Sequence, residues 1–211
     1  MPKILILLMA ALLCLSADRD LLAAEKEARN AALLSPLEAY DLLMRKPETA
    51  FIVDVRSRQE YAWLGHPAGA YNIPWRFSGQ DLQISAGQTG SPPQAGYQLT
   101  AEPNPDFIGV ASSLFKETDH LLIICTDGQQ SAQASDALWA AGFKNTAQIK
   151  GGVWGEKFSS RDQPRLAEKY SGNYGKPGLI NGWAYWGLPM SYQLDPRYLY
   201  PPDVKRAQSG N

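Results

Sequence analysis

The sequence predicts an α/β domain in which helices flank a central parallel sheet. Short apolar runs at 50–55 and 121–125 indicate buried strands, and a third strand is expected near 146–150. Segments with helical character lie between these runs. Strands that alternate with helices favour parallel pairing, because right-handed crossovers return the chain to the same edge of the sheet. With 211 residues the chain is long enough for one domain with its own core.

The first predicted helix has a clear start. Ser35 can cap it, Pro36 suits the first turn and Glu38 completes a capping box. The helix is expected to end at Lys46-Pro47. Four side chains are assigned to its buried face: Leu37, Tyr40, Leu42 and Leu43.

The middle of the chain alternates short elements with one long irregular stretch. Residues 57–63 indicate a helical turn, and residues 70–73 a short strand that Pro74 stops. Residues 76–103 are rich in Gly, Gln, Ser and Pro and show no period, which predicts a long loop insertion. That insertion is either a tolerated surface loop or a lid near Cys125. A helix is then expected from Asn104-Pro105-Asp106 to about residue 116.

Cys125 ends the apolar run at 121–125, immediately before a polar loop and an alanine-rich helix at 130–142. Loop N–H groups can point at a sulfur placed there, and the helix dipole favours a thiolate. We therefore expect a reactive cysteine that ionises more readily than a free thiol, although Asp127 opposes this. The alternative is a small buried hydrophobe. The loop predicted to hold the sulfur comprises Thr126, Asp127, Gly128, Gln129, Gln130 and Ser131.

The C-terminal part loses its regular pattern after Gly151-Gly152. The predicted domain spans 35–190 and contains a second insertion at 153–180. A C-terminal tail is expected at 191–211. Aromatic side chains are interleaved with prolines here. We expect this segment to pack back over the domain, and the alternative is a surface that binds a partner. Its aromatic residues are Trp183, Tyr185, Trp186, Tyr192, Tyr198 and Tyr200.

The N-terminus has the features of a secretory signal peptide at residues 1–17. Lys3 precedes an apolar run at 4–15 that is too short to span a bilayer comfortably, and Ala17 offers a cleavage site. A retained anchor and a lipidated Cys14 are the alternatives. Cleavage predicts a periplasmic protein without a membrane attachment, in which Cys125 is the remaining cysteine. Residues 18–34 would form a leader helix or tail.

Composition argues against several functional classes. The formal net charge is −1, and charges of both signs are spread along the chain, so no nucleic-acid partner is expected. Two histidines and two cysteines do not supply a usual zinc site, and neither a metal nor another cofactor is predicted. His66 is expected to be structural, with proton transfer as the alternative. Between Cys125 and Lys144 there is no arginine, which disfavours a phosphatase loop.

Several motifs occur in an order and spacing that resemble the rhodanese-like family of sulfurtransferases. The resemblance covers residues 35–152 and resumes at 181–189, and the tail is similar to that of exported bacterial single-domain members. It implies an α/β fold around a parallel sheet and a cysteine that carries sulfur as a persulfide. The motifs are Ile52-Val53-Asp54-Val55-Arg56, Glu60-Tyr61, Gly65-His66-Pro67-Ala68-Gly69-Ala70-Tyr71-Asn72-Ile73-Pro74, Leu122-Ile123-Ile124-Cys125, Ala141-Gly142-Phe143 and Gly151-Gly152.

The loop departs from the pattern of active members of that family. They usually carry one arginine directly after the cysteine and another before the closing serine, where this chain has Thr126 and Gln130. The resemblance still implies a small sulfur donor and a thiol or other thiophilic acceptor, with thiosulfate disfavoured as the donor. The alternative is a catalytically silent binding module that recognises a periplasmic protein partner.

Overall fold

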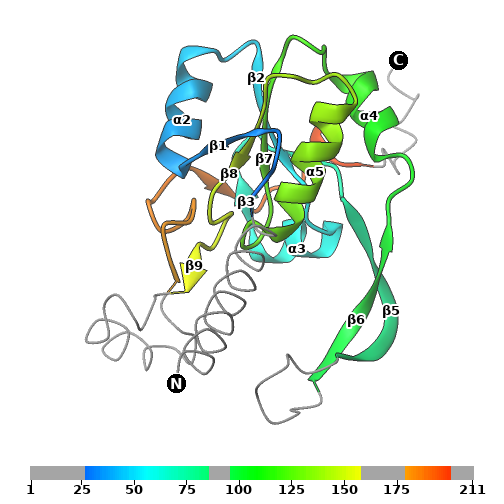
Figure 1. Cartoon of the computed structure of the whole chain (residues 1–211). Helices are drawn as coiled ribbons and strands as arrows, with labels where there is room; N and C mark the ends of the chain where they lie inside the picture. The colour runs from blue at the N-terminus through cyan, green and yellow to red at the C-terminus, as the bar shows by residue number, and fades with distance from the viewer. Residues whose placement is uncertain (1–26, 86–95, 158–178, 201–211) are drawn as a thin grey trace, which may run out of the picture.

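The computed structural model describes residues 27–85, 96–157 and 179–200, and it contains a five-stranded sheet in which every pairing is parallel (Figure 1). The predicted α/β class with a central parallel sheet is thereby confirmed. The carboxyl ends of all five strands meet at one edge, which is where such sheets place their sites. In spatial order the strands are β1 (Ala32–Leu34), β8 (Thr146–Ile149), β7 (His120–Ile124), β2 (Ala50–Asp54) and β4 (Tyr71–Asn72).

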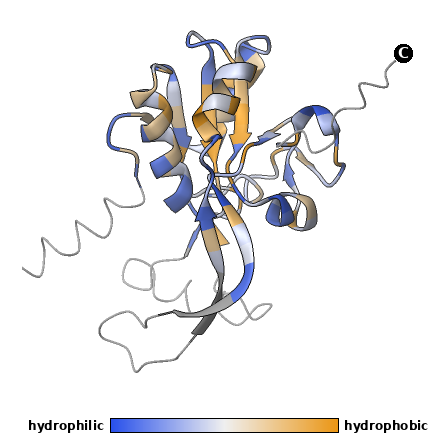
Figure 2. Cartoon of the chain, turned by 90° about the vertical axis from the view of Figure 1, so that its right-hand side faces the viewer, coloured by the Kyte–Doolittle hydropathy of each residue, from blue (hydrophilic) through white to orange (hydrophobic). Residues whose placement is uncertain are grey.

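Helices cover both faces of the sheet (Figure 2). The strands alternate their side chains between the two faces. Leu121 and Ile123 pack with the cluster that includes α4 and α5, whereas Leu122 and Ile124 pack with α2 and α3. All four side chains are 0% exposed. A strand buried on both faces explains the uninterrupted apolar run in the sequence. The helices are α2 (Pro36–Arg45), α3 (Arg58–Leu64), α4 (Phe107–Leu114) and α5 (Gln129–Ala140).

The start of α2 agrees with the predicted capping box. The Ser35 side chain accepts from the Glu38 N–H at 3.3 Å, and the Ser35 N–H donates to the Glu38 carboxylate at 2.8 Å. The buried face differs from the prediction in one respect. Pro36 and Ala39 are buried, whereas Leu37 is 45% exposed. Of the remaining residues assigned to that face, Tyr40, Leu42 and Leu43 are partly buried against the core.

The predicted leader helix or tail at 18–34 is wrong for its last residues. Ala32–Leu34 form β1, which pairs with β8 so that Leu34 lies opposite Ile149. A strand of three residues is too short to show a period, and its position depends on β8, a partner more than a hundred residues away. The predicted signal peptide at 1–17 and residues 18–26 lie outside the described residues.

The long loop predicted for the insertion at 76–103 is wrong in its described residues. Its described residues form an antiparallel pair, β5 (Arg76–Ser85) and β6 (Gly96–Pro103), which projects from the end of the sheet that carries α3 (Figure 1). The register shifts between Ser78 and Leu82, so the pairing contains an irregularity. The interrupted alternation hid this ribbon in the sequence.

The C-terminal segment packs back over the domain, as predicted for Trp183 and Tyr200, which are 1% and 7% exposed. The Trp183 indole N–H donates to the Pro189 carbonyl at 3.0 Å, and its ring meets Tyr40 edge-on at 6.0 Å. By contrast, Tyr185, Trp186 and Tyr192 are exposed. The small elements here are β3 (His66–Pro67) paired with β11 (Met190–Ser191), β9 (Glu156–Lys157) paired with β10 (Leu179–Ile180), and a 3-10 turn at Pro196–Tyr198.

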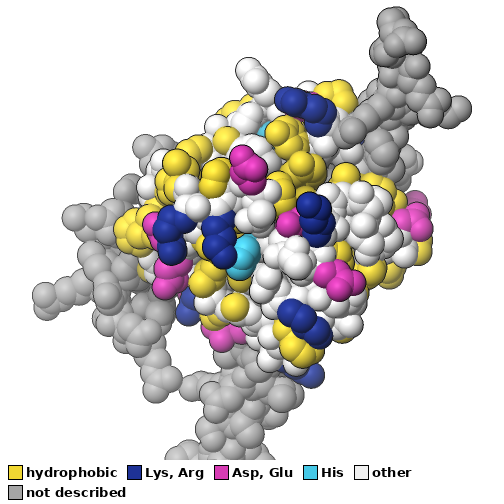
Figure 3. All heavy atoms as spheres, turned by 90° about the horizontal axis from the view of Figure 1, so that it is seen from above, with side chains coloured by type: hydrophobic (Ala, Val, Ile, Leu, Met, Phe, Trp, Pro, Cys, Tyr) yellow, Lys and Arg dark blue, Asp and Glu magenta, His cyan; other side chains and the backbone are white. Residues whose placement is uncertain are grey.

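The surface at the amino ends of the strands mixes lysine and arginine with acidic and hydrophobic side chains (Figure 3). No helix within the described ranges 27–85, 96–157 and 179–200 has the length and apolar character needed to cross a membrane.

Replacing Trp183 with alanine should lower the free energy of unfolding by about 3–5 kcal/mol, because a fully packed indole is lost. Urea unfolding measures this change. Trp63→Ala is the matched control, since Trp63 is 78% exposed, and its change should stay within about 0.5 kcal/mol. Equal losses in the two variants would contradict the anchoring role of Trp183.

Candidate functional site

Cys125 lies directly after β7, at the carboxyl edge of the sheet. The neighbouring strand β2 ends at the same level, because Asp54 pairs with Ile124 and the Val55 N–H donates to the Ile124 carbonyl at 2.9 Å. Behind the cysteine, α5 begins at Gln129. The structure therefore brings together the strand end, the polar loop and the helix N-terminus, as the sequence predicted.

The sulfur of Cys125 is enclosed by the loop. It accepts a hydrogen bond from the Gly128 N–H at 3.2 Å, and the thiol donates to the Ser131 hydroxyl at 3.4 Å. Cys125 is 1% exposed and Ser131 is 0% exposed. Gly128 caps α5 with φ 102°, in the left-handed region where a side chain would be strained. This backbone turn is what aims its N–H at the sulfur.

The carbonyl of Gly128 is held as firmly as its N–H. It accepts from the Ala132 N–H at 3.1 Å, the Ser131 hydroxyl at 2.9 Å and the Gln148 amide at 2.8 Å. Sequence reasoning missed Gln148, which lies in β8 and is 1% exposed. A polar residue inside a strand buried on both faces is a signal that could have singled it out, because such a group needs a partner.

The outer part of the loop is connected to α3. The Thr126 hydroxyl donates to one carboxylate oxygen of Glu60 at 3.0 Å, while the other oxygen accepts from the Ser57 hydroxyl at 2.7 Å in the capping box of α3. Asp127 accepts from the Gln129 N–H at 3.3 Å. The two remaining predicted residues differ in setting: Gln129 is exposed, and Gln130 is half-buried with an Oε1 atom that has no hydrogen-bond partner.

The turn at Gly151-Gly152 supports the loop from behind. The Val153 N–H donates to the Cys125 carbonyl at 2.8 Å, and the Trp154 N–H donates to the Thr126 carbonyl at 3.2 Å. A side chain at Gly152 would come within 2.9 Å of the Asp127 nitrogen. The close approach of two backbones therefore requires glycine at this position.

Three further residues of the predicted motifs have structural contacts. Asp54 and Arg56 are both 0% exposed and form a bidentate pair, with Nε–Oδ1 at 2.9 Å and Nη2–Oδ2 at 2.6 Å. Arg56 also donates to the Gly65 carbonyl at 2.8 Å, which ties the strand end to the next turn. The ring of His66 stacks on the ring of Tyr61 with 3.6 Å between their centroids, and burial lowers the pKa of the His66 imidazole. These contacts fit the structural role predicted for His66.

The prediction that Cys125 ionises readily is wrong. Burial raises the pKa of the Cys125 thiol, and the hydrogen bonds from Ser131 and from the N–H groups of Asp127 and Gly128 do not offset it. Loss of water disfavours a thiolate more than the loop donors favour it. The sequence shows where the helix begins but not how completely the sulfur is covered.

Within the described ranges, no group of three or more His, Cys, Asp or Glu side chains is placed to hold a metal ion.

Comparisons with known proteins agree with the fold. The profile of the rhodanese-like domain family matches residues 35–155. The chain is 30% identical over 127 residues to "Thiosulfate sulfurtransferase 16, chloroplastic" of Arabidopsis thaliana, covering 60% of this chain and 88% of that protein. It is 31% identical over 100 residues to "Senescence-associated protein DIN1" of Raphanus sativus, covering 47% and 44%. It thus spans less than half the length of the radish protein.

A solved structure shows the same fold. The crystal structure of Rv0390 from M. tuberculosis superimposes with a TM-score of 0.52 at 18% identity, covering 78% of this chain and 99% of that one. Both named relatives are plant proteins. The similarity to an exported bacterial subgroup therefore stays a prediction from the sequence.

The alkylation rate of Cys125 should rise with pH to a midpoint above that of a free cysteine, about 8.5, because burial disfavours the thiolate. Ser131→Ala should move the midpoint higher, because the Ser131 hydroxyl can donate to the sulfur once the thiol has lost its proton, and this donation lowers the pKa of the thiol. Because the folded pKa of the thiol is raised, protonated Cys125 contributes to the free energy of unfolding. This contribution is fully present below the pKa of the unfolded thiol and is lost as pH rises through the folded pKa. A midpoint at or below the free value would refute this account.

Proposed function

We propose that this chain, which belongs to the rhodanese-like domain family, is an exported sulfurtransferase that carries sulfane sulfur as a persulfide on Cys125. The contact from the Gly128 N–H to the sulfur, at 3.2 Å, is the observation that carries the proposal. Backbone donors at a helix N-terminus stabilise negative charge on a sulfur without a cofactor. A relative named as a thiosulfate sulfurtransferase supports sulfur as the cargo.

The transfer needs two displacement steps and no oxidant. The Cys125 thiolate attacks the outer sulfur of the donor, so that a new S–S bond forms while the donor's bond to that sulfur breaks and its leaving group takes the electron pair. A thiol or other thiophilic acceptor then attacks the outer sulfur of the persulfide, and Cys125 leaves as a thiolate. The residues from Thr126 to Ser131 form the cradle of the intermediate.

The charges around the loop favour a donor with little negative charge. Its residues 126–131 include no cation, and Asp127 adds an anionic side chain. The Thr126 hydroxyl is bonded to the Glu60 carboxylate at 3.0 Å, so a second anion lies beside the cysteine loop. Like charges repel a dianion such as thiosulfate. A persulfide donor and a thiol acceptor fit these surroundings better.

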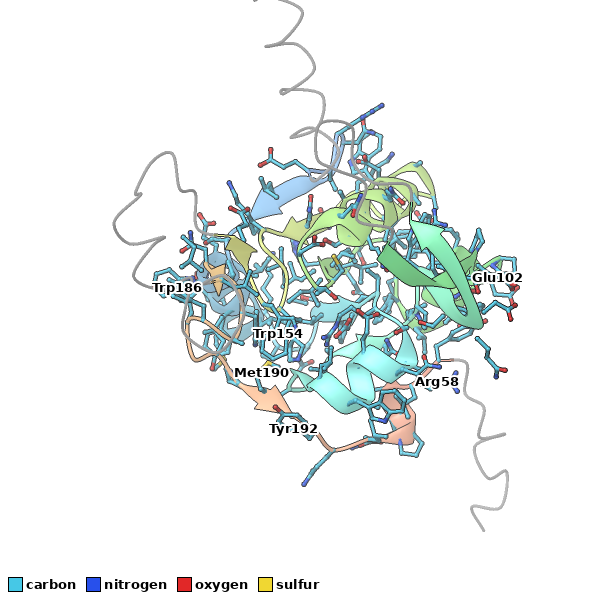
Figure 4. The ribbon with its side chains drawn as sticks, turned by 90° about the horizontal axis from the view of Figure 1, so that it is seen from below. Arg58, Glu102, Trp154, Trp186, Met190 and Tyr192 are labelled. Carbon is cyan, nitrogen blue, oxygen red and sulfur yellow. The ribbon has the colours of Figure 1, made fainter. Side chains whose placement is uncertain are left out.

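A second candidate function is a binding module that has lost sulfur transfer. The observation that favours it is the exposure of Tyr185, Trp186 and Tyr192, at 53%, 45% and 66%. Figure 4 shows Trp154, Trp186, Met190 and Tyr192 on the side away from Glu102, at the end of the molecule that carries α3. Exposed aromatic side chains are enriched in protein interfaces. A periplasmic protein would be the partner in that case.

The mature protein should be recovered from the periplasm with an N-terminus near Asp18. Lys3, the apolar run at 4–15 and Ala17 motivate this expectation. Cell fractionation followed by intact-mass analysis checks both the compartment and the cleavage site. Full-length protein found in the cytosol would contradict export.

Purified wild-type protein should gain the mass of one sulfur atom from at least one sulfane donor, whereas Cys125→Ser should gain none. Intact-mass analysis after exposure to thiosulfate and to small persulfides measures the adduct. Thr126→Ala is the matched control, because it removes the hydroxyl bonded to Glu60 but leaves the backbone cradle, and it should retain most of the adduct.

The double variant Thr126→Arg, Gln130→Arg tests the charge argument within the same experiment. It should raise the efficiency of sulfur loading from thiosulfate by roughly ten- to a hundredfold, because an arginine–anion contact contributes about 1.5–3 kcal/mol. Neutral donors should gain much less. If the wild type and the double variant both stay folded and never take up sulfur, the carrier proposal fails. The binding module then leads, and replacing the exposed Tyr185, Trp186 and Tyr192 with alanine should abolish capture of its partner while the fold stays intact.

A further inference from the structure

Gln148 joins the sulfur cradle to the segment before the first helix. Its amide nitrogen donates to the Gly128 carbonyl at 2.8 Å and lies 3.5 Å from the Ser131 hydroxyl. Its amide oxygen accepts from the Ala28 N–H at 2.7 Å. One buried side chain therefore touches the loop residue that donates to the sulfur and the N-terminal segment of the described chain.

The same N-terminal segment is also bonded to α5. The N–H groups of Arg29, Asn30 and Ala31 donate to the Asp136 carboxylate at 2.9, 2.8 and 3.4 Å. Asp136 is two turns along the helix whose start forms the cradle. Residues 28–31 lie before the stretch 35–155 that the family profile matches. The contacts therefore come from a part of the chain outside that match.

We propose that Gln148 is a positioning residue for Cys125. Braced by the N-terminal segment, the Gln148 side chain holds Gly128 so that the Gly128 N–H points at the sulfur. The proposal deepens the sulfur-transfer function and rests on it for its catalytic consequence. Its geometric part concerns the thiol alone and holds for any chemistry at Cys125.

The physical reason lies in the freedom of glycine. Gly128 has φ 102° and no side chain, so its own stereochemistry does not restrict it to the orientation that serves the sulfur. The helix bond from the Ala132 N–H fixes the carbonyl in part. The Gln148 amide donates a hydrogen bond to the same carbonyl from another direction, and the Ala28 N–H in turn holds the amide in place. An amide is suited to this place because it donates at one end and accepts at the other.

Gln148→Met tests the proposal, since methionine keeps the length of the side chain but loses both hydrogen bonds. Thr146→Val is the matched control. Thr146 lies on the same strand, is 2% exposed and bonds the Phe143 carbonyl at 2.8 Å, away from the cysteine loop. The readouts are the rate of sulfur loading, the pH midpoint of alkylation of Cys125 by iodoacetamide, and urea unfolding.

Gln148→Met should lower the maximal rate of sulfur loading about three- to tenfold, the effect expected for one lost hydrogen bond. The half-saturating donor concentration should stay within about twofold, because the brace does not touch the donor. The alkylation midpoint should move to higher pH, since the Gly128 N–H no longer steadies the thiolate. Thr146→Val should destabilise the fold without changing the loading rate or the midpoint.

A second variant keeps the test decisive if Gln148→Met fails to fold. Ala28→Pro removes the N–H that holds the Gln148 oxygen and leaves the cradle residues intact. It should shift the midpoint in the same direction by a smaller amount. A midpoint that stays or falls in the folded variant overturns the proposal, as does an equal effect in Thr146→Val. If the wild type never loads sulfur, the proposed function fails, and the midpoints still decide the role of Gln148.

Discussion

The site depends on one constraint, the left-handed conformation of Gly128. With φ 102° its N–H points at the Cys125 sulfur, while its carbonyl accepts three donors on the other side. The residue also caps α5, so that the direction of the helix and the aim of the N–H are fixed together. Any side chain at this position would oppose that conformation. The strand end, the loop and the helix thus share one backbone turn.

Burial of the sulfur explains why Cys125 does not ionise readily. The helix N-terminus and the loop donors favour negative charge, but a sulfur that is 1% exposed loses the solvation of its thiolate. Dehydration dominates, and the pKa of the Cys125 thiol is raised. In a persulfide the charge moves to an outer sulfur, further from the strand end. The same donors can then serve the loaded state rather than the resting thiol.

Much of the fold could be predicted because its signals are local. The run at 121–125, the capping box of Ser35 and Glu38, and the polar loop after Cys125 each lie within a few residues, and the structure has them as expected. The strand β1 could not be predicted, since it exists through pairing with β8, more than a hundred residues away. The ribbon β5–β6 was missed because an irregularity in its pairing interrupts the alternation. Leu37 was misplaced because Pro36 and Ala39 already fill the contact of α2 with the core.

The candidate site was predicted as a list of loop residues, and the residues that hold the loop came from elsewhere. Gln148 belongs to β8 and Glu60 to α3, so that neither lies near Cys125 in sequence. The sequence did single out Glu60, but only within the family motif Glu60-Tyr61. Its second carboxylate oxygen is free to accept from Thr126 because the cap uses the first one.

This double use of Glu60 links the departure from the family pattern to the charge of the site. An arginine after the cysteine would lie beside the Glu60 carboxylate and would neutralise it. Threonine instead donates a hydroxyl and leaves the negative charge in place. The loop stays fixed to α3 through a hydrogen bond from an uncharged hydroxyl to this carboxylate, so its geometry does not need a cation. The geometry of this loop and its attraction for a charged sulfur donor are thus separate properties. A chain can keep the loop geometry and still change which sulfur donor it attracts.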